Sequence, residues 1–165
     1  MPIKFDITLT AKDMYRFNMY QTYSGFQGWF SVVVSILVFV LAGRTYGRVE
    51  PMYTVLYVAF GIVFLTYLPG SLYMRSKHSL AASEVLRGTL HYVVGEEGIA
   101  VSQGEANAEL PWTQIYKLVA TKHNVLVYSN RTNAYVIPRD QLGDAYDALA
   151  GLAAAKLEKF RLKLK

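Results

Sequence analysis

Two long stretches without any Asp, Glu, Lys, Arg or His residue constrain this sequence more than any other feature. The first covers 27 residues between Arg16 and Arg44, and the second covers 24 residues between Glu50 and Arg75. A helix rises about 1.5 Å per residue, so each stretch exceeds the roughly 30 Å hydrocarbon core of a bilayer. Backbone polar groups in lipid must bond to one another, which a helix allows. Because a short charged segment with turn-forming residues separates the two stretches, the sequence predicts a transmembrane helical hairpin over residues 25–74.

Two alternatives to the hairpin are open at this point. A soluble protein would have to bury both apolar helices with only about 115 other residues, which is too few to cover them. A cleaved signal peptide would end near Ala42, where small residues are found. Its N-terminal region would then be unusually long and would contain Asp6 and Asp13, which is atypical of such peptides.

Aromatic and basic residues give the expected orientation. Tyr and Trp side chains concentrate at membrane interfaces, and basic residues concentrate on the cytoplasmic side. The expected interface aromatics are Tyr20, Tyr23, Trp29, Tyr67 and Tyr73 at the open end of the hairpin and Tyr53 at its turn. The open end is flanked by Lys12, Arg16, Arg75, Lys77 and Arg87, against Arg44 and Arg48 in the turn. We therefore expect a multi-pass protein of the cell inner membrane with both termini in the cytoplasm.

The remaining sequence predicts a small α+β domain. Alternating apolar residues from Ile3 to Leu9 indicate a strand, and Thr10–Asp13 resembles a capping box that starts an amphipathic helix. Short alternating segments separated by turns follow the hairpin, and they are expected at 89–94, 99–103, 109–115, 116–121, 125–129 and 134–137. A helix to the C-terminus follows Asp140. The fold class is thus an α+β membrane protein, with the hairpin joined to an antiparallel sheet or barrel that the C-terminal helix closes.

The expected organisation has four parts. They are an N-terminal strand and helix (1–24), the transmembrane hairpin (25–74), a linker helix (75–86) and a cytoplasmic sheet domain (87–165). Several motifs in the sheet domain, together with this order of parts, resemble the YcxB-like family of small bacterial membrane proteins. The motifs are Leu90–Val94, Gly95–Ile99, Leu110–Ile115 and Val136–Leu142. The resemblance implies a pleckstrin-homology-like (PH-like) cytoplasmic domain and assigns no chemistry.

No residue pattern in the sequence predicts catalysis, metal binding or a cofactor. Cysteine is absent, and His78, His91 and His123 lack the spacing of metal ligands. No glycine-rich segment has the form of a phosphate-binding loop. Four carboxylates gather around two turns, and we interpret them as solvated turn charge: Glu96, Glu97, Glu105 and Glu109. Trp112 is expected within a strand, either in the core or, if exposed, as an interaction anchor.

The C-terminal tail holds most of the excess charge. Residues 156–165 contain five basic residues and one acidic residue, which accounts for +4 of the net charge of +5. At helical spacing, apolar side chains form one stripe with basic residues on both flanks, an arrangement that suits a helix lying on anionic lipid. The membrane-surface residues would be Lys156, Lys159, Phe160, Arg161, Lys163 and Lys165. A solvated helix end is the equal alternative.

These expectations favour a non-enzymatic membrane protein. Neither apolar stretch holds an ionisable residue of the kind that pumps and transporters require, which favours an anchor. The charge excess lies in one short tail, which argues against nucleic-acid binding by the folded domain. We expect the hairpin to anchor an interaction or regulatory domain that binds a partner protein and the anionic inner leaflet. The alternatives are an accessory subunit of a larger membrane complex, with the hairpin as its interface, and a membrane-bound enzyme.

Overall fold

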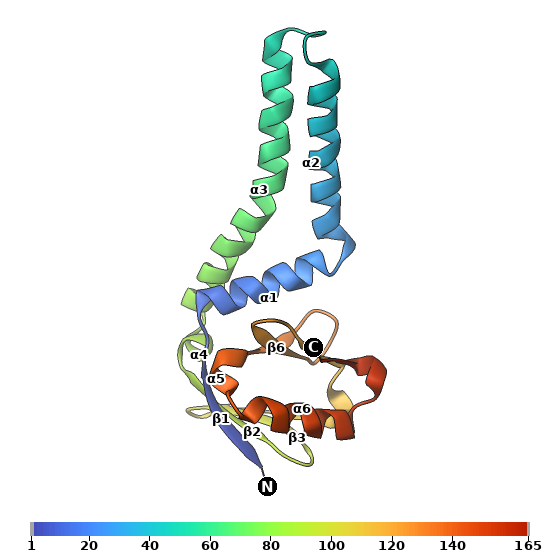
Figure 1. Ribbon diagram of the computed structural model, residues 1–165. Coiled ribbons are helices and arrows are strands. Elements are labelled where there is room, and N and C mark those ends of the chain that lie inside the picture. The colour runs from blue at the N-terminus through green and yellow to red at the C-terminus, as the bar shows by residue number, and fades with distance from the viewer. Residues whose placement is uncertain (1, 165) are drawn as a thin grey trace. The chain divides into compact units, whose positions relative to one another are not determined.

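The computed structural model describes residues 2–164, which form two compact units (Figure 1). The hairpin unit comprises Asn18–Ser76, and the sheet unit comprises the chain up to Phe17 and from Lys77 onward. Two helices belong partly to each unit, α1 (Ala11–Tyr23) and α3 (Pro51–Ala82). The chain thus leaves the sheet unit through α1 and returns to it through α3.

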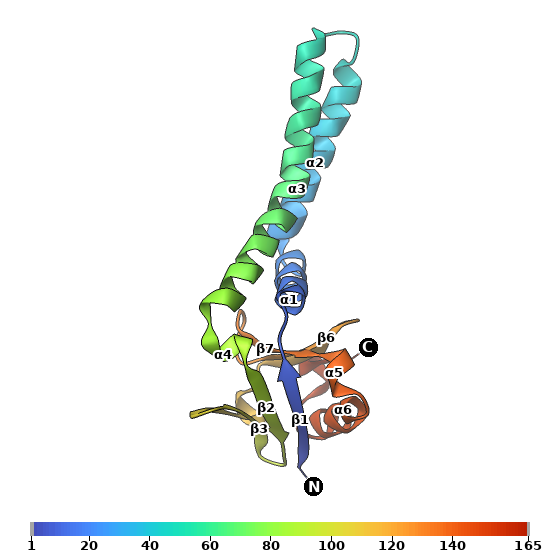
Figure 2. The same ribbon diagram turned by 90° about the vertical axis from the view of Figure 1, so that its left-hand side faces the viewer.

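In the hairpin unit, α2 (Phe26–Thr45) and α3 lie side by side (Figures 1 and 2). The Ser31 hydroxyl donates a hydrogen bond of 2.7 Å to the backbone oxygen of Phe64. Further along, the ring of Phe39 packs so close to Gly61 that a Cβ atom there would lie 2.6 Å from Cε1. Small residues at the contact therefore allow the two helices to approach closely.

Both helices are long and apolar enough to cross a membrane. Their buried positions carry small side chains, namely Gly28, Ser35 and Ala42 in α2 and Gly61 and Ser76 in α3. Large apolar side chains are instead exposed along both helices. The core helix of a soluble protein buries such side chains, so this pattern favours contact with lipid.

The expected pair of apolar helices is confirmed, with different bounds. The helix α3 continues through Pro69 to Ala82 without a break. It thereby includes most of the expected linker helix, and the four-residue helix α4 (Glu84–Arg87) supplies the rest. The Ser83 hydroxyl caps α4 by accepting a hydrogen bond from the backbone N–H of Leu86.

The sheet unit contains two four-stranded sheets. The first sheet is antiparallel in the order β1-β2-β3-β4, with β1 (Ile3–Thr8), β2 (Thr89–Val94), β3 (Gly98–Gln103) and β4 (Ala106–Pro111). The second sheet has the order β7-β6-β5-β8, with β5 (Lys117–Ala120), β6 (Asn124–Tyr128), β7 (Ala134–Pro138) and β8 (Leu162–Lys163). Its β5–β8 pairing is parallel and its other pairings are antiparallel. The sheet unit also contains the helices η1 (Trp112–Gln114), α5 (Arg139–Leu142), α6 (Ala145–Lys156) and η2 (Lys159–Arg161).

Residues from both sheets and from α6 form the core. In β2, Leu90, Tyr92 and Val94 are buried while the residues between them face outward. Figure 2 shows β1 beside β2, and the rings of Phe5 and Tyr92 stack at a centroid distance of 5.3 Å across that pairing. Buried Leu149 shows that α6 turns its apolar side toward the same core.

The sequence predicted an antiparallel sheet or a barrel, and the described strands form two open sheets and no closed barrel. On one side, β4 ends at Pro111, and the η1 turn interrupts the strand before β5 begins. On the other side, a closed barrel would need a further strand hydrogen-bonded to the outer edge of β1. A side chain forms hydrogen bonds there instead. The backbone N–H of Thr8 donates to Gln141 Oε1 (2.8 Å), and Gln141 Nε2 donates to the oxygen of Thr8 (2.9 Å). A helix residue therefore blocks this edge of the sheet.

Two further expectations are wrong. The strand predicted at 109–115 lies earlier, at Ala106–Pro111, and it ends there because Trp112 begins η1. The predicted helix to the C-terminus ends at Lys156, where Leu157 adopts an extended conformation and is buried. The chain then pairs Leu162 with Leu118, which covers the free edge of β5. Burial of Leu157 and the added pairing override the helical tendency of the tail.

Candidate functional site

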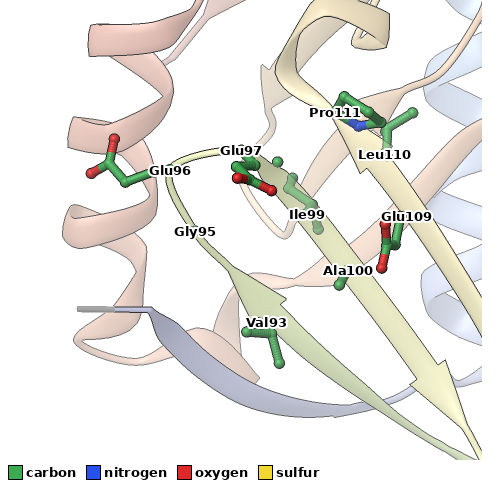
Figure 3. Close-up of a pocket in the computed structure, with 10 residues that line it drawn as sticks. Val93, Gly95, Glu96, Glu97, Ile99, Ala100, Glu109, Leu110 and Pro111 are labelled. Carbon is green, nitrogen blue, oxygen red and sulfur yellow. The ribbon is translucent and has the colours of Figure 1, made fainter.

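A depression of the sheet unit lies at the turn between β2 and β3 and the end of β4 (Figure 3). It has a volume of about 610 Å³ and is open to solvent. Apolar residues and carboxylates share its lining, which comprises Val93, Gly95, Glu96, Glu97, Gly98, Ile99, Ala100, Glu109, Leu110 and Pro111.

A tight turn and a buried indole hold this depression in shape. The backbone N–H of Gly95 donates to the oxygen of Gly98 (2.9 Å), which closes the turn. The indole N–H of Trp112 donates to the oxygen of Gly95 (2.9 Å), and the backbone N–H of Trp112 donates to the oxygen of Glu97 (3.2 Å). Trp112 is only 5% exposed. Of its two expected roles, the structure therefore shows the core role, and the side chain is not available as a surface anchor.

Three of the four clustered carboxylates line the depression, and they differ in their surroundings. Glu96 is directed away from Glu97 and Glu109, toward α6 (Figure 3). Its Oε2 lies 2.6 Å from Nζ of Lys156. Glu105, at the turn between β3 and β4, is not part of the lining.

The charge state of Glu96 limits what the depression can do chemically. The hydrogen bond and the positive charge from Lys156 lower the pKa of Glu96 below its ordinary value. A general acid at neutral pH requires the opposite shift, toward a raised pKa. The carboxylates in the lining, next to apolar residues, are better suited to accept hydrogen bonds from a basic group of a partner.

The three histidines lie on different elements. His91 in β2 faces its cross-strand neighbour Asp6, with 2.6 Å between Nδ1 and Oδ1. His123 lies in the turn between β5 and β6, and His78 lies near the end of α3. Among residues 2–164, no group of three or more His, Asp or Glu side chains is arranged to hold a metal ion.

Tyr92 is the most strongly perturbed ionisable group in the core. Burial, reinforced by the nearby Tyr135, raises the pKa of Tyr92. Its phenol therefore stays neutral over the physiological pH range. It is part of the apolar packing between the sheets and does not reach the depression.

The expected interface aromatics lie on helices α1, α2 and α3. Tyr20 and Tyr23 are in the second half of α1, and Trp29 is in the first two turns of α2. Tyr67 and Tyr73 are in the second half of α3, whereas Tyr53 is in its first turn. The contact between Ser31 and Phe64 aligns the first half of α2 with the middle of α3. The location of these aromatics at a membrane interface stays a prediction.

The expected membrane-surface residues of the tail are separated by the change from helix to strand. Lys156 is paired with Glu96, and Arg161 donates from Nη1 to the oxygen of Ile115 (3.4 Å). Lys159 and Phe160 lie in η2, where Phe160 is 74% exposed. Lys163 lies in β8, and Lys165 falls outside the described residues. Their contact with lipid stays a prediction, without the helical stripe that suggested it.

Sequence reasoning missed two polar residues that organise the sheet unit, Gln141 and Asn124. Gln141 blocks the edge of β1. Asn124 is buried in β6 and donates from Nδ2 to the oxygen of Asp13 (3.2 Å). Both contacts join segments more than 100 residues apart. For Asn124 the only signal was its place at the end of a turn, and for Gln141 there was none.

One comparison with known proteins finds a similarity over part of the chain. Residues 94–153 match the model of the YcxB-like protein family. This match confirms the resemblance inferred from the motifs. No curated protein and no solved structure matches the chain.

The YcxB-like segment contains most of the residues that line the depression and three of the four strands of the second sheet. It begins at the last residue of β2 and ends within α6. It includes the Gly95–Gly98 turn, Trp112 and the start of α6. The depression therefore lies in the region that the family model describes.

Proposed function

We propose that this protein is a non-enzymatic inner-membrane protein whose hairpin anchors a PH-like interaction or regulatory domain at the cytoplasmic face. One observation carries the proposal. The strand β1 precedes the hairpin and β2 follows it, and the two pair over six residues from Ile3–Val94 to Thr8–Thr89. A folded sheet unit is thereby fixed to two apolar helices through two chain connections.

The PH-like assignment rests on the arrangement of strands and the final helix. Two mostly antiparallel sheets, with the helix α6 against their core, fit the layout that the family resemblance implies. Domains built this way mostly bind proteins or lipids, although fold analogy alone assigns no function. The acidic depression favours a partner protein that presents a basic residue, because opposite charges across an interface guide association.

Partner binding can be tested with charge reversals in the depression. The test pair is Glu97→Lys and Glu109→Lys, and the control pair is Glu84→Lys and Glu105→Lys, which reverses two exposed carboxylates outside it. Full-length proteins would be cross-linked in cells, purified in mild detergent and analysed by mass spectrometry. We expect partners to be lost from the test pair and retained by the control pair.

A hairpin exchange distinguishes the main alternative. Residues 26–74 would be replaced by an unrelated two-span hairpin, with β1 and the rest of the sheet unit retained. The proposal is supported by partners that still bind after the hairpin exchange but are lost from the variants Glu97→Lys and Glu109→Lys. The opposite result would favour an accessory subunit that uses its hairpin as the interface.

The orientation can be tested because the sequence has no cysteine. Tyr46→Cys places a thiol in the turn between α2 and α3, and Glu105→Cys places one in the sheet unit. We expect a maleimide that cannot cross the inner membrane to label position 46 in cells whose outer envelope has been made permeable. Position 105 should be labelled only after lysis. Labelling in the reverse order would overturn the cytoplasmic placement, which rests on the distribution of basic residues.

A further inference from the structure

A second charged surface forms where the start of α1 meets the turn between β5 and β6. Asn124, 1% exposed, reaches from the turn to α1 through its hydrogen bond to the oxygen of Asp13. Within the turn, Thr121 and Asn124 are joined by three hydrogen bonds of 2.8 to 3.0 Å. The backbone N–H of Arg139 also donates to the oxygen of His123 (2.8 Å). The turn is therefore held firmly against the first turns of α1.

This arrangement brings together cationic side chains that are far apart in the sequence. We call Lys12, Arg16, Lys122 and His123 the α1–turn cluster. Lys12, Lys122 and His123 are exposed, and the side chain of Arg16 is 29% exposed. Partial desolvation and the positive charges of Arg16, Lys122 and Lys12 together lower the pKa of His123. The hydrogen bond from Asn124 to the oxygen of Asp13 holds together the two segments that carry these four side chains.

Two carboxylates, Asp13 and Asp140, lie near the cluster and leave part of the positive charge of its lysines and arginine uncompensated. Asp13 is buried, accepts hydrogen bonds from Thr10 and lies 3.6 Å from Nη1 of Arg16. Asp140 opposes the lowering of the His123 pKa, so it also lies nearby. Within residues 2–164, neither Lys12 nor Lys122 has a carboxylate partner within ion-pair distance. Like charges held together by a rigid backbone repel one another, and a bound anion would remove that repulsion.

The position of the cluster in the chain indicates the kind of anion. Arg16 is seven residues before the end of α1 at Tyr23, and α2 begins at Phe26. A helix advances about 1.5 Å per residue and extended chain at most about 3.5 Å, so Arg16 lies within roughly 20 Å of an apolar helix. If that helix enters a membrane, phospholipid headgroups are within reach of the cluster.

We propose that the α1–turn cluster binds a phosphate-bearing anion, of the kind that the headgroup of an anionic phospholipid carries. Arg and Lys side chains donate charge-assisted hydrogen bonds to phosphate oxygens, and Arg can do so with two parallel bonds. This site is separate from the carboxylate-lined depression. A lipid source rests on the proposed membrane anchoring, whereas binding of soluble phosphate does not.

The site differs from the tail in how its lysines are engaged. In the tail, Lys156 and Arg161 already bond to protein oxygens. In the cluster, Arg16 pairs with Asp13, but Lys12 and Lys122 have no carboxylate partner within residues 2–164. The first two hairpin turns of the sheet unit carry Glu96, Glu97 and Glu105, which repel phosphate. The turn between β5 and β6 instead carries Lys122 and His123, and it is the one that packs on α1.

The experiment uses the full chain in a neutral detergent and follows the His123 ring protons by NMR, assigned with a His123→Asn sample. Three additions are compared: short-chain phosphatidylglycerol, phosphatidylcholine with the same acyl chains, and inorganic phosphate. A bound anion favours the protonated imidazole, so it raises the pKa of His123, and binding strengthens as the pH falls through that pKa. We expect phosphatidylglycerol to raise the pKa of His123 and phosphatidylcholine to leave that pKa unchanged.

The variant Lys12→Gln/Lys122→Gln removes two charges from the cluster. Lys4→Gln/Arg87→Gln removes two exposed charges elsewhere and serves as the control. We expect at least a tenfold loss of phosphatidylglycerol affinity in the first variant and less than a twofold loss in the control, with equal thermal melts. Equal losses in both variants, or an equal response to both lipids, would overturn the site, as would no response to any of the three additions. A response to phosphate alone would support the anion site and identify a soluble ligand.

Discussion

Close approach of β4 to Gly98 should make this position intolerant of a methyl group. A Cβ atom at Gly98 would lie 2.4 Å from the oxygen of Leu110 and 2.7 Å from the Cα of Pro111. Ordinary contacts lie near 3.5–4.0 Å, so β4 would have to shift by about 1 Å. Both neighbours are backbone atoms in the β3–β4 pairing and cannot rotate away. We expect Gly98→Ala to destabilise the sheet unit by about 3 kcal/mol, at the upper end of overpacking effects.

Gly95→Ala provides a matched control in the same turn. No atom lies within 4 Å of a Cβ placed there. Neither glycine has a positive φ angle, so backbone strain does not separate the two variants. Gly95→Ala should be neutral or should stabilise the unit by up to about 1 kcal/mol, because alanine restricts the unfolded chain.

The assay is urea unfolding of the full chain in neutral detergent. A Trp29→Phe background leaves Trp112 as the single tryptophan, and its buried indole reports on this turn. With a slope of about 1.5 kcal/mol per molar urea, a loss of 3 kcal/mol lowers the unfolding midpoint by about 2 M. Equal midpoints for Gly98→Ala and Gly95→Ala would show that β3 and β4 do not approach each other as described.

Three more changes test the packing and charge of the sheet unit. Trp112→Phe should cost about 1–3 kcal/mol by circular dichroism, because the oxygen of Gly95 loses its indole donor. Leu126→Ala should cost about 2–5 kcal/mol in the same measurement, since Leu126 is fully buried in β6. Lys156→Gln should raise the pKa of Glu96 toward its ordinary value in an NMR titration. Because the folded-state pKa of Glu96 is lowered, the pair stabilises the fold above the ordinary carboxyl pKa, and the difference from Lys156→Gln should vanish in acid. A Glu96 pKa unaffected by this substitution would remove the ion pair as its cause.

Local sequence patterns predicted most of the elements, because each pattern reflects a local constraint. The capping box at Thr10 is confirmed by hydrogen bonds in both directions, from the Thr10 N–H to Asp13 Oδ2 (3.1 Å) and from the Asp13 N–H to Thr10 Oγ1 (3.3 Å). The strand predicted at 89–94 has the bounds of β2. These elements depend on residues a few positions apart, which the sequence displays directly.

The tail shows where local pattern fails. Residues 160–164 alternate apolar and basic side chains, a pattern typical of a strand, yet the same apolar residues also fit a helical stripe. Whether the tail forms a strand or a helix depends on β5, whose free edge lies more than 40 residues earlier in the sequence. The alternation could have indicated β8, although nothing in the tail itself decides between the two periods.

The candidate site was also only partly predictable from the sequence. Clustering of Glu96, Glu97 and Glu109 around two turns was visible in the sequence, and the structure places all three at one depression. The pairing of Glu96 with Lys156 was not visible, because 60 positions separate the two residues.

The sequence by itself determined that the chain has two apolar helices, since the absence of charge over two long stretches is a property of composition and length. It also determined the strand-forming character of the segments around them. The tertiary structure alone decided that Thr8 and Thr89, 81 positions apart, are neighbours, so that the hairpin interrupts the first sheet. It likewise decided that Gln141 takes the place of a further strand beside β1. Pairings of this kind depend on loop closure and on competition between distant edges for the same hydrogen bonds, which no local pattern records.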